Sequence, residues 1–391
     1  MAAFEGAADP SKAIESGYYV HAPGKLLVDH ISGRIALRPS SSHLLIGGIG
    51  SGKTTQLLVA CEQINEIEDI HAIYVDVSLY TDISQISSGV LTAIAGLKLS
   101  EIMADSENET VKKYINLIFN LAFGYSEEHD IDLTISNLAL ALNTKSWNRR
   151  HKGIIPNTSD KYGVKAELLE AVTEIRKAAS TKYGHIVLLF DGLDRLDDAK
   201  TFMQIVSSDA KAISSAGIGL VIVGPIIALY SEYRDTVDNR LDYFYHQPFF
   251  DINNDQTAYN FFEKIIQTRS SEDFIEKSAI EALIKLSGGV LRDFISLSQA
   301  SIEETYLSNQ NKVEVRHVIN AVTSFSRNQL LGISEDELKI VRQTMNTEIF
   351  IPRTDEDLRL LVRRIILEYR YPKIRHTVHP ALEPFIEKIT E

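Results

Sequence analysis

The sequence lacks the cysteine pairs that stabilise small secreted proteins and the long apolar runs that anchor a chain in a membrane. Its 391 residues include one cysteine, Cys61, so no internal disulfide can form, which fits a reducing compartment. Acidic residues outnumber basic ones by 53 to 40, and the formal net charge of −13 excludes a general attraction to nucleic acid or anionic membranes. The longest apolar run, Ile218 to Tyr230, is interrupted by Gly224-Pro225 and is too short to cross a bilayer. We therefore expect a cytoplasmic protein that does not contact a membrane.

The order of sequence patterns along the chain indicates how it is organised. Residues 1–17 are small, polar and acidic, and we expect a flexible leader. Strand and helix patterns alternate over residues 18–252, with a looser insertion at about 100–160, which predicts an α/β core with a parallel sheet. Residues 253–330 show only helical periodicity and predict a helical lid. Residues 331–391 predict two helices and a hairpin, the order found in a winged helix.

The most informative stretch is a short apolar strand followed by a glycine-rich loop. It fits the P-loop pattern G-x-x-x-x-G-K-[ST], in which glycines allow successive backbone N–H groups to surround a phosphate at a helix start. Lys53 would contact the β- and γ-phosphates of ATP, and the Thr54 hydroxyl would ligate Mg²⁺. A glycine-rich turn without a ligand is the alternative, but the flanking strand and helix patterns favour the P-loop. The expected nucleotide-binding residues are Gly47, Gly48, Ile49, Gly50, Ser51, Gly52, Lys53, Thr54 and Thr55.

A second strand pattern ends in acidic residues. Five apolar residues precede Asp191, which would hold the Mg²⁺ shell at the carboxyl end of a buried parallel strand. Many P-loop ATPases have Glu at the next position, where this chain has Gly192. Asp194 is therefore our candidate for orienting the attacking water, and an N-cap of the helix from Leu196 onward is the alternative.

Three arginines are candidates for stabilising phosphate charge. Arg240 and its rival Arg234 precede the last predicted strand, where either could reach the nucleotide of a neighbouring subunit. Arg292 follows Gly288-Gly289 in the first turn of a predicted helix and could contact the γ-phosphate. A surface position without such a role is the alternative for each of them.

The predicted winged helix contains the most basic stretch of the chain. Six basic residues occur there with one acid, Glu368, and we expect a contact surface for duplex DNA, for an acidic partner or for the protein's own acidic residues. A second basic segment, residues 147–152, is expected to be a solvated loop. The six residues are Arg359, Arg363, Arg364, Arg370, Lys373 and Arg375.

These motifs together resemble those of AAA+/STAND-type P-loop ATPases, in the layout of origin-recognition and signal-switch ATPases. The resemblance rests on the P-loop, on Asp191-Gly192-Leu193-Asp194, on Gly288-Gly289-x-x-Arg292 and on the terminal helices and hairpin. It implies Mg²⁺ and ATP bound between core and lid, in many members at a subunit interface, with hydrolysis of the ATP. Two departures point to slow or partner-dependent hydrolysis: Gly192, and the lack of a polar γ-phosphate sensor after the strand that ends at Val223.

Two functions are consistent with this resemblance. The first is a regulatory ATPase switch that controls a separate effector protein, by analogy also in bacterial defence against phage. The second is a DNA-binding ATPase that loads onto or remodels DNA through its winged helix. The acidic composition favours the first and the basic stretch favours the second. Under either, we expect partner proteins and self-association through the nucleotide interface.

Overall fold

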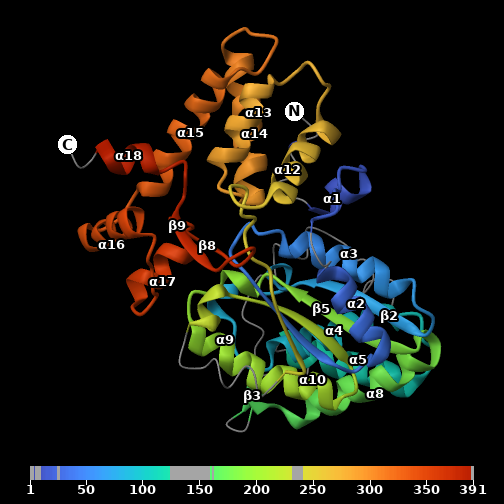
Figure 1. Cartoon of the computed structure of the whole chain (residues 1–391). Helices are drawn as coiled ribbons and strands as arrows, with labels where there is room; N and C mark the ends of the chain where they lie inside the picture. Colours follow the sequence, from blue (N-terminus) through green and yellow to red (C-terminus); the bar gives the residue numbers. More distant parts are fainter. Residues whose placement is uncertain are drawn as a thin grey trace. The chain divides into compact units, whose positions relative to one another are not determined.

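The computed structural model describes residues 4, 10–23, 27–123, 159–160, 163–230 and 241–388. Arg234, Arg240 and the basic segment 147–152 lie outside the described residues. The chain divides into two compact units (Figure 1). The sheet unit comprises Leu27–Ile46 and Gln56–Tyr245, and the helical unit comprises Met1–Leu26, Gly47–Thr55 and His246–Glu391. The domain boundaries expected at residues 17, 252 and 330 stay predictions.

The sheet unit is built on five strands in the order β2-β5-β6-β1-β7. Pairing is parallel between β2 and β5, between β5 and β6, and between β6 and β1. Every residue of β1 and β6 is buried, as expected for a sheet that helices cover on both faces. This confirms the predicted α/β class with a parallel sheet. The strands are β1 (Ser42–Ile46), β2 (Ile70–Asp76), β5 (His185–Asp191), β6 (Gly219–Gly224) and β7 (Tyr243–His246).

The strand order identifies the edge of the sheet where a ligand can bind. The chain runs from β1 to β2 at one side of the sheet and returns through β5 and β6, so that β6 and β7 flank β1. In open parallel sheets, ligands bind beyond the carboxyl ends of the strands, where the strand order reverses. Gly47 directly follows β1 and Gly192 directly follows β5. Both predicted motifs therefore begin at the carboxyl edge of the sheet.

The helices of the sheet unit follow the predicted pattern except near Asp82. Asp82 followed by Ile83 and Ile86 is a sequence pattern that predicts the N-cap of a helix continuing through Val90, but Asp82 caps only the 3₁₀ turn η3 (Ile83–Gln85). The next helix begins at Val90 after Gly89, whose φ of 90° ends any helical run. Among the described helices, none has the length and apolarity needed to cross a bilayer. The helices named here are α2 (Leu27–Leu37), α3 (Lys53–Asn65), α4 (Val90–Ile102), α5 (Glu109–Phe123), α8 (Ala166–Tyr183), α9 (Ala199–Ile205) and α10 (Lys211–Ser215).

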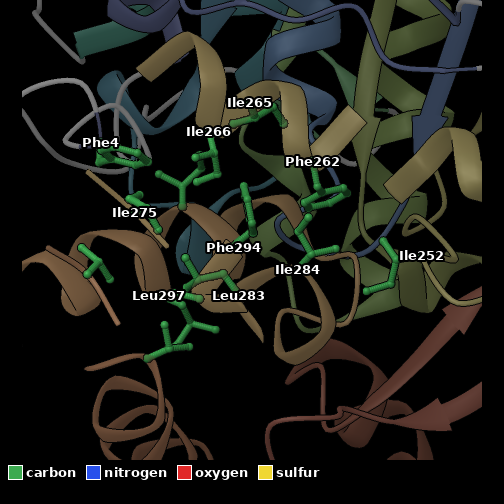
Figure 2. Packing of buried hydrophobic residues seen from close by; sticks show 14 of the residues in the cluster. Phe4, Ile252, Phe262, Ile265, Ile266, Ile275, Leu283, Ile284, Phe294 and Leu297 are labelled. Carbon is green, nitrogen blue, oxygen red and sulfur yellow. The ribbon is translucent and has the colours of Figure 1, made fainter. Parts of the chain in front are cut away.

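The helical unit has a hydrophobic core of its own. Helices α12 to α15 contribute aromatic and branched side chains to one cluster, in which Phe262, Phe294 and Leu283 are fully buried (Figure 2). Two further helices and an antiparallel hairpin follow, in the order predicted, and the term winged helix stays an interpretation of them. The elements are α1 (Pro10–Glu15), α12 (Gln256–Arg269), α13 (Lys277–Leu286), α14 (Leu291–Leu307), α15 (Val315–Leu330), α16 (Glu335–Thr347), α17 (Asp355–Val362), β8 (Ile366–Tyr369), β9 (Arg375–Val378) and α18 (Glu383–Lys388).

Candidate nucleotide site

The glycines of the P-loop are required for two reasons: the backbone angles of the loop, and the close approach of neighbouring residues to it. Gly50 and Gly52 have φ values of 88° and 97°, in the left-handed region that side chains rarely adopt. A Cβ on Gly47 would lie 2.2 Å from the carbonyl oxygen of Gln247, and one on Gly48 would lie 2.3 Å from the ring of Phe249. Two glycines therefore fix the loop conformation, and two allow the segment after β7 to pack against it. The sequence indicated only the first requirement.

Polar groups in the loop fit an anion. The buried Lys53 starts α3, and its Nζ donates hydrogen bonds of 2.9 Å to the carbonyl oxygens of Gly47 and Gly48. The Ser51 hydroxyl is buried and has no hydrogen-bond partner among the described residues. Buried polar groups are almost always paired, so this hydroxyl and the lysine at a helix start suit a phosphate group.

Arg292 lies beside the P-loop, as its predicted role requires. It occupies the first turn of α14, and its backbone N–H donates a 3.2 Å hydrogen bond to the carbonyl oxygen of Gly50. A Cβ on Gly50 would lie 2.8 Å from the Cβ of Arg292. The arginine side chain is exposed at the surface of the unit. Its contact with a γ-phosphate stays a prediction.

The last residue of β7 and the residue after it supply two polar side chains that the sequence analysis did not single out. Gln247 Nε2 donates a 3.4 Å hydrogen bond to the carbonyl oxygen of Ser51. Both ring nitrogens of His246 are buried without a hydrogen-bond partner in the described part of the chain. Burial lowers the pKa of His246 to about 4; the positive charges of Arg370 and Lys53 act in the same direction, and Glu368 opposes them. The imidazole is therefore neutral at pH 7, and no sequence motif marks it.

In the sheet unit, two carboxylates end neighbouring strands. Asp191 accepts hydrogen bonds from the Tyr74 hydroxyl at 2.9 Å and from the Gly192 N–H at 2.8 Å. Asp76 stands opposite Asp191 in the register of β2 and β5 and accepts hydrogen bonds from the backbone and hydroxyl of Ser78. Burial, together with the charge of Asp191, raises the pKa of Tyr74, so this hydroxyl remains a donor. Asp76 and Tyr74 were not predicted as site residues, because their relation to Asp191 depends on strand pairing.

This carboxylate pair is typical of magnesium held jointly with phosphates. Mg²⁺ is commonly bound by one or two carboxylates, with waters and phosphate oxygens completing its shell. No group of three or more His, Cys, Asp or Glu side chains within the described ranges could hold a metal ion alone. Asp191 and Asp76 therefore fit a cation that arrives with a nucleotide. Their joint action with Thr54 stays a prediction.

The alternative role of Asp194 as a helix cap is wrong. Asp194 lies inside the 3₁₀ turn η4 (Leu193–Arg195). The next helix, α9, begins at Ala199, and Asp198 caps it by accepting hydrogen bonds from the N–H groups of Lys200 and Thr201. Asp194 is half-buried one turn beyond Asp191, and its part in hydrolysis stays a prediction.

The lack of a polar residue after Val223 has a steric cause. Gly224 ends β6, and a Cβ there would lie 2.5 Å from Cζ of Phe202 and 3.1 Å from Cδ1 of Leu44. A side chain at this position would collide with the core of the sheet unit. No side chain at position 224 can therefore serve as a γ-phosphate sensor.

Most basic side chains of the stretch near the hairpin form ion pairs with carboxylates of the helical unit. Arg364 pairs with Asp293 through two 3.0 Å contacts, and Arg375 pairs with Asp251 at 2.7 and 2.6 Å. These observations favour the prediction that the stretch contacts the protein's own acidic residues. The other pairs are Arg370 with Glu368, Arg359 with Glu337, and Arg363 with the carbonyl oxygens of Gln329 and Leu331, whereas Lys373 is exposed.

Comparisons with known proteins find structures of similar arrangement. No family model and no curated protein matches the chain. The ORC2 protein of Aeropyrum pernix, solved in ADPNP–ADP complexes, is 12% identical with a TM-score of 0.45 and covers 95% of this chain and 97% of its own. Cdc6p of Pyrobaculum aerophilum is 14% identical with a TM-score of 0.44, covering 96% and 99%. A Walker-type ATPase of Pyrococcus abyssi is 14% identical with a TM-score of 0.47, covering 95% and 99%.

Proposed function

We propose that this chain is an AAA+-type ATPase that binds Mg²⁺ and ATP and acts as a regulatory switch on a separate effector protein. The observation that carries the proposal is the P-loop itself. Its Ser51 hydroxyl is buried without a partner in the described residues, and its Lys53 ammonium faces the loop at the start of α3. Backbone N–H groups, a lysine and a helix start together form a site for the phosphates of a nucleotide.

Each site residue has a distinct part in this proposal. Lys53 binds the β- and γ-phosphates, and Thr54 with Asp191 holds the magnesium. Asp194 orients the attacking water. Bound Mg²⁺ neutralises phosphate charge, while Arg292 in the same subunit and Arg240 from a neighbouring subunit add positive charge. Gly192 and the glycine after Val223 leave two common ATPase groups missing, which supports slow hydrolysis that a partner controls.

The charge distribution favours a protein partner over DNA. The formal charge of the chain is −13, and most of the basic stretch is already paired within the helical unit. An effector in bacterial defence against phage is the setting that we propose by analogy with signal-switch ATPases. The alternative is an ATPase that loads onto or remodels DNA, and exposed Lys373 at the hairpin is the residue that supports it.

The proposal is tested by nucleotide binding to three purified proteins. Lys53→Ala should weaken the affinity for ATP by about a hundredfold, because a charged donor to the phosphates is lost. Lys339→Ala is the matched control, since this lysine pairs with Asp336 on the exposed face of α16. Isothermal titration with Mg²⁺-ATP gives the three dissociation constants. Equal affinity in the Lys53→Ala variant and the wild type would reject the P-loop as the binding site.

A hydrolysis assay separates binding from chemistry. Asp191→Ala should weaken the Mg²⁺-dependent part of ATP binding, whereas Asp194→Asn should bind ATP normally and hydrolyse it about a hundredfold more slowly. Phosphate release is measured at saturating ATP, alone and with captured partner proteins. Hydrolysis at the wild-type rate by Asp194→Asn would show that another group orients the water.

A further inference from the structure

The P-loop packs on a small hydrophobic cluster, of which only Val290 belongs to one of the nucleotide motifs. We call this the rear cluster, and it consists of Phe249, Val290, Leu367 and Tyr369. Gly48 lies against the ring of Phe249, and Gly50 lies against Cγ1 of Val290. Leu367 and Tyr369 belong to β8, so the terminal hairpin contributes half of the surface behind the loop. The four residues come from three separate parts of the chain.

The buried hydroxyl of Tyr369 connects the hairpin to the turn that precedes Val290. Tyr369 is 1% exposed, and its hydroxyl donates a 2.7 Å hydrogen bond to the carbonyl oxygen of Gly288. Gly288 has a φ of 59°, and a Cβ there would lie 2.6 Å from Leu367. The turn that carries this carbonyl runs on through Val290 to Arg292, whose N–H donates to Gly50 in the P-loop. A short chain of contacts therefore leads from Tyr369 to the phosphate-binding backbone.

Two arginine–aspartate pairs hold the hairpin and its approach in place. Arg375 on β9 makes the paired contacts with Asp251, two residues after Phe249, and its guanidinium carbon lies 4.5 Å from the centre of the Tyr369 ring. Arg364, just before β8, pairs with Asp293, the residue after Arg292. Paired, partly buried arginine–carboxylate contacts of this kind fix geometry more strongly than single surface ion pairs.

We propose that the terminal hairpin positions the P-loop through the rear cluster, with Tyr369 as the central positioning residue. This inference rests on the proposed binding of a nucleotide at the P-loop. A loop that binds phosphate through backbone N–H groups depends on its conformation being set before the ligand arrives. The residues that hold the loop from behind therefore contribute to affinity without touching the nucleotide.

The coupling must act in both directions. If a docked hairpin strengthens nucleotide binding, bound nucleotide strengthens hairpin docking by the same factor. Nucleotide binding at the P-loop then changes how firmly the hairpin is docked. A partner can contact this hairpin at Tyr371 and Ile374, which are 66% and 70% exposed. The hairpin thus gives the proposed switch a defined place at which a partner detects nucleotide.

The test removes one hydroxyl from the rear cluster. Tyr369→Phe keeps the ring and deletes the hydrogen bond to Gly288, and Tyr371→Phe makes the same change at the exposed end of the hairpin. Nucleotide affinity and dissociation rate are measured with a fluorescent ATP analogue at a temperature where circular dichroism shows every protein folded. Tyr369→Phe should weaken binding about fivefold, the effect of one lost hydrogen bond, and Tyr371→Phe should leave it unchanged.

Hydrogen exchange supplies the reciprocal measurement. Saturating nucleotide should slow exchange of the amides in β8 and β9 in the wild type and should have no effect in Lys53→Ala. Unchanged affinity in Tyr369→Phe, or equal hairpin exchange with and without nucleotide, would overturn the inference while the wild type still binds ATP. Failure of the wild type to bind ATP would instead reject the proposed function on which the inference rests.

Discussion

Gly192 illustrates how one backbone angle can decide which side chains are available for catalysis. Its φ is 94°, and a Cβ there would lie 3.3 Å from Oδ1 of Asp76. The glutamate that many P-loop ATPases have after the strand-ending aspartate would be strained at this position and would crowd a second carboxylate. The turn through Gly192 carries the chain to Asp194 instead. Any carboxylate that activates water must therefore come from Asp194 or from another element.

At the same scale, His43 makes stability depend on pH. This β1 residue is completely buried between two hydroxyls, since Tyr245 O–H lies 3.0 Å from Nδ1 and Ser41 Oγ lies 2.7 Å from Nε2. Ser41 donates its own proton to the Arg38 carbonyl oxygen, so it accepts from Nε2–H of a neutral ring. Burial lowers the pKa of His43 from 6.5 to about 4, and Arg34 and Arg38 act in the same direction against Asp242.

The unfolded chain therefore binds a proton at His43 at a higher pH than the folded protein does. The stabilising effect is complete above pH 6.5 and is lost as pH falls from 6.5 towards 4. Between pH 7 and pH 5 the wild type should lose about 2 kcal/mol more unfolding free energy than His43→Gln does. Urea unfolding at both pH values measures this difference. His30→Gln, at an exposed position, is the control and should lose as much unfolding free energy between pH 7 and pH 5 as the wild type does. A loss in His43→Gln equal to that of the wild type would contradict the role given to His43.

At the scale of elements, the start of α4 depends on a residue far along the chain. Gly89 at its N-cap has no side chain to accept hydrogen bonds. The fully buried Asp209, in a π-helical turn, instead accepts them from the N–H groups of Gly89 and Thr92 at 2.8 and 2.9 Å. The hydroxyls of Thr92 and Ser208 also donate to Asp209. One carboxylate thus caps a helix that lies about 120 residues away in sequence.

Asp209→Ala should destabilise the sheet unit strongly. The substitution leaves the buried N–H groups of Gly89 and Thr92 and the Thr92 hydroxyl without their acceptor, while the Ser208 hydroxyl keeps the carbonyl oxygen of Gln204. We expect a loss of about 2 to 4 kcal/mol. Asp82→Ala is the matched control, since Asp82 caps the exposed turn η3 and should contribute less than about 1 kcal/mol. Thermal and urea unfolding of both variants compare the two caps. Similar small losses in the two variants would show that the π-helical turn rearranges to satisfy α4.

The same two caps show why helix boundaries were only partly predictable. Asp82 followed by apolar residues is a typical N-cap pattern, but Gly89 interrupts the helix before it can extend. The helices between residues 253 and 330 follow more directly from the sequence, because their apolar periodicity is continuous. In the terminal segment, the Ser334 capping box is a local signal that marks the start of α16.

At the scale of the whole molecule, charge decides which partners the chain can attract. The total charge of −13 already includes the basic stretch, and the guanidinium groups of that stretch are engaged by carboxylates and carbonyl oxygens. Exchanging these contacts for DNA phosphates would remove the arginine partners of the buried Asp251 and Asp293, which would keep only Asn254 and His379 beside them. The cost of removing an arginine from a buried carboxylate makes that exchange unfavourable.

Duplex binding should therefore be weak and only slightly salt-dependent. If all six basic residues contacted phosphates, the slope of log affinity against log salt would be about −5; with Lys373 as the main contact, we expect about −1. Fluorescence anisotropy of a labelled duplex over a salt series measures the slope. Lys373→Ala should abolish the remaining dependence. A slope of about −4 with nanomolar affinity would favour the DNA-handling alternative over the protein switch.

The sequence by itself determined the features whose signals are local. The P-loop, the strand that ends at Asp191 and the order of the later helices and hairpin were all predictable, because each depends on the spacing of neighbouring residues. Only the tertiary structure decided what stands around them. Asp76 lies beside Asp191 through strand pairing, Tyr369 stands behind the P-loop, and Arg375 meets Asp251 from 124 residues away. These contacts form by packing between segments that are distant in sequence, so the local periodicity of the chain does not predict them.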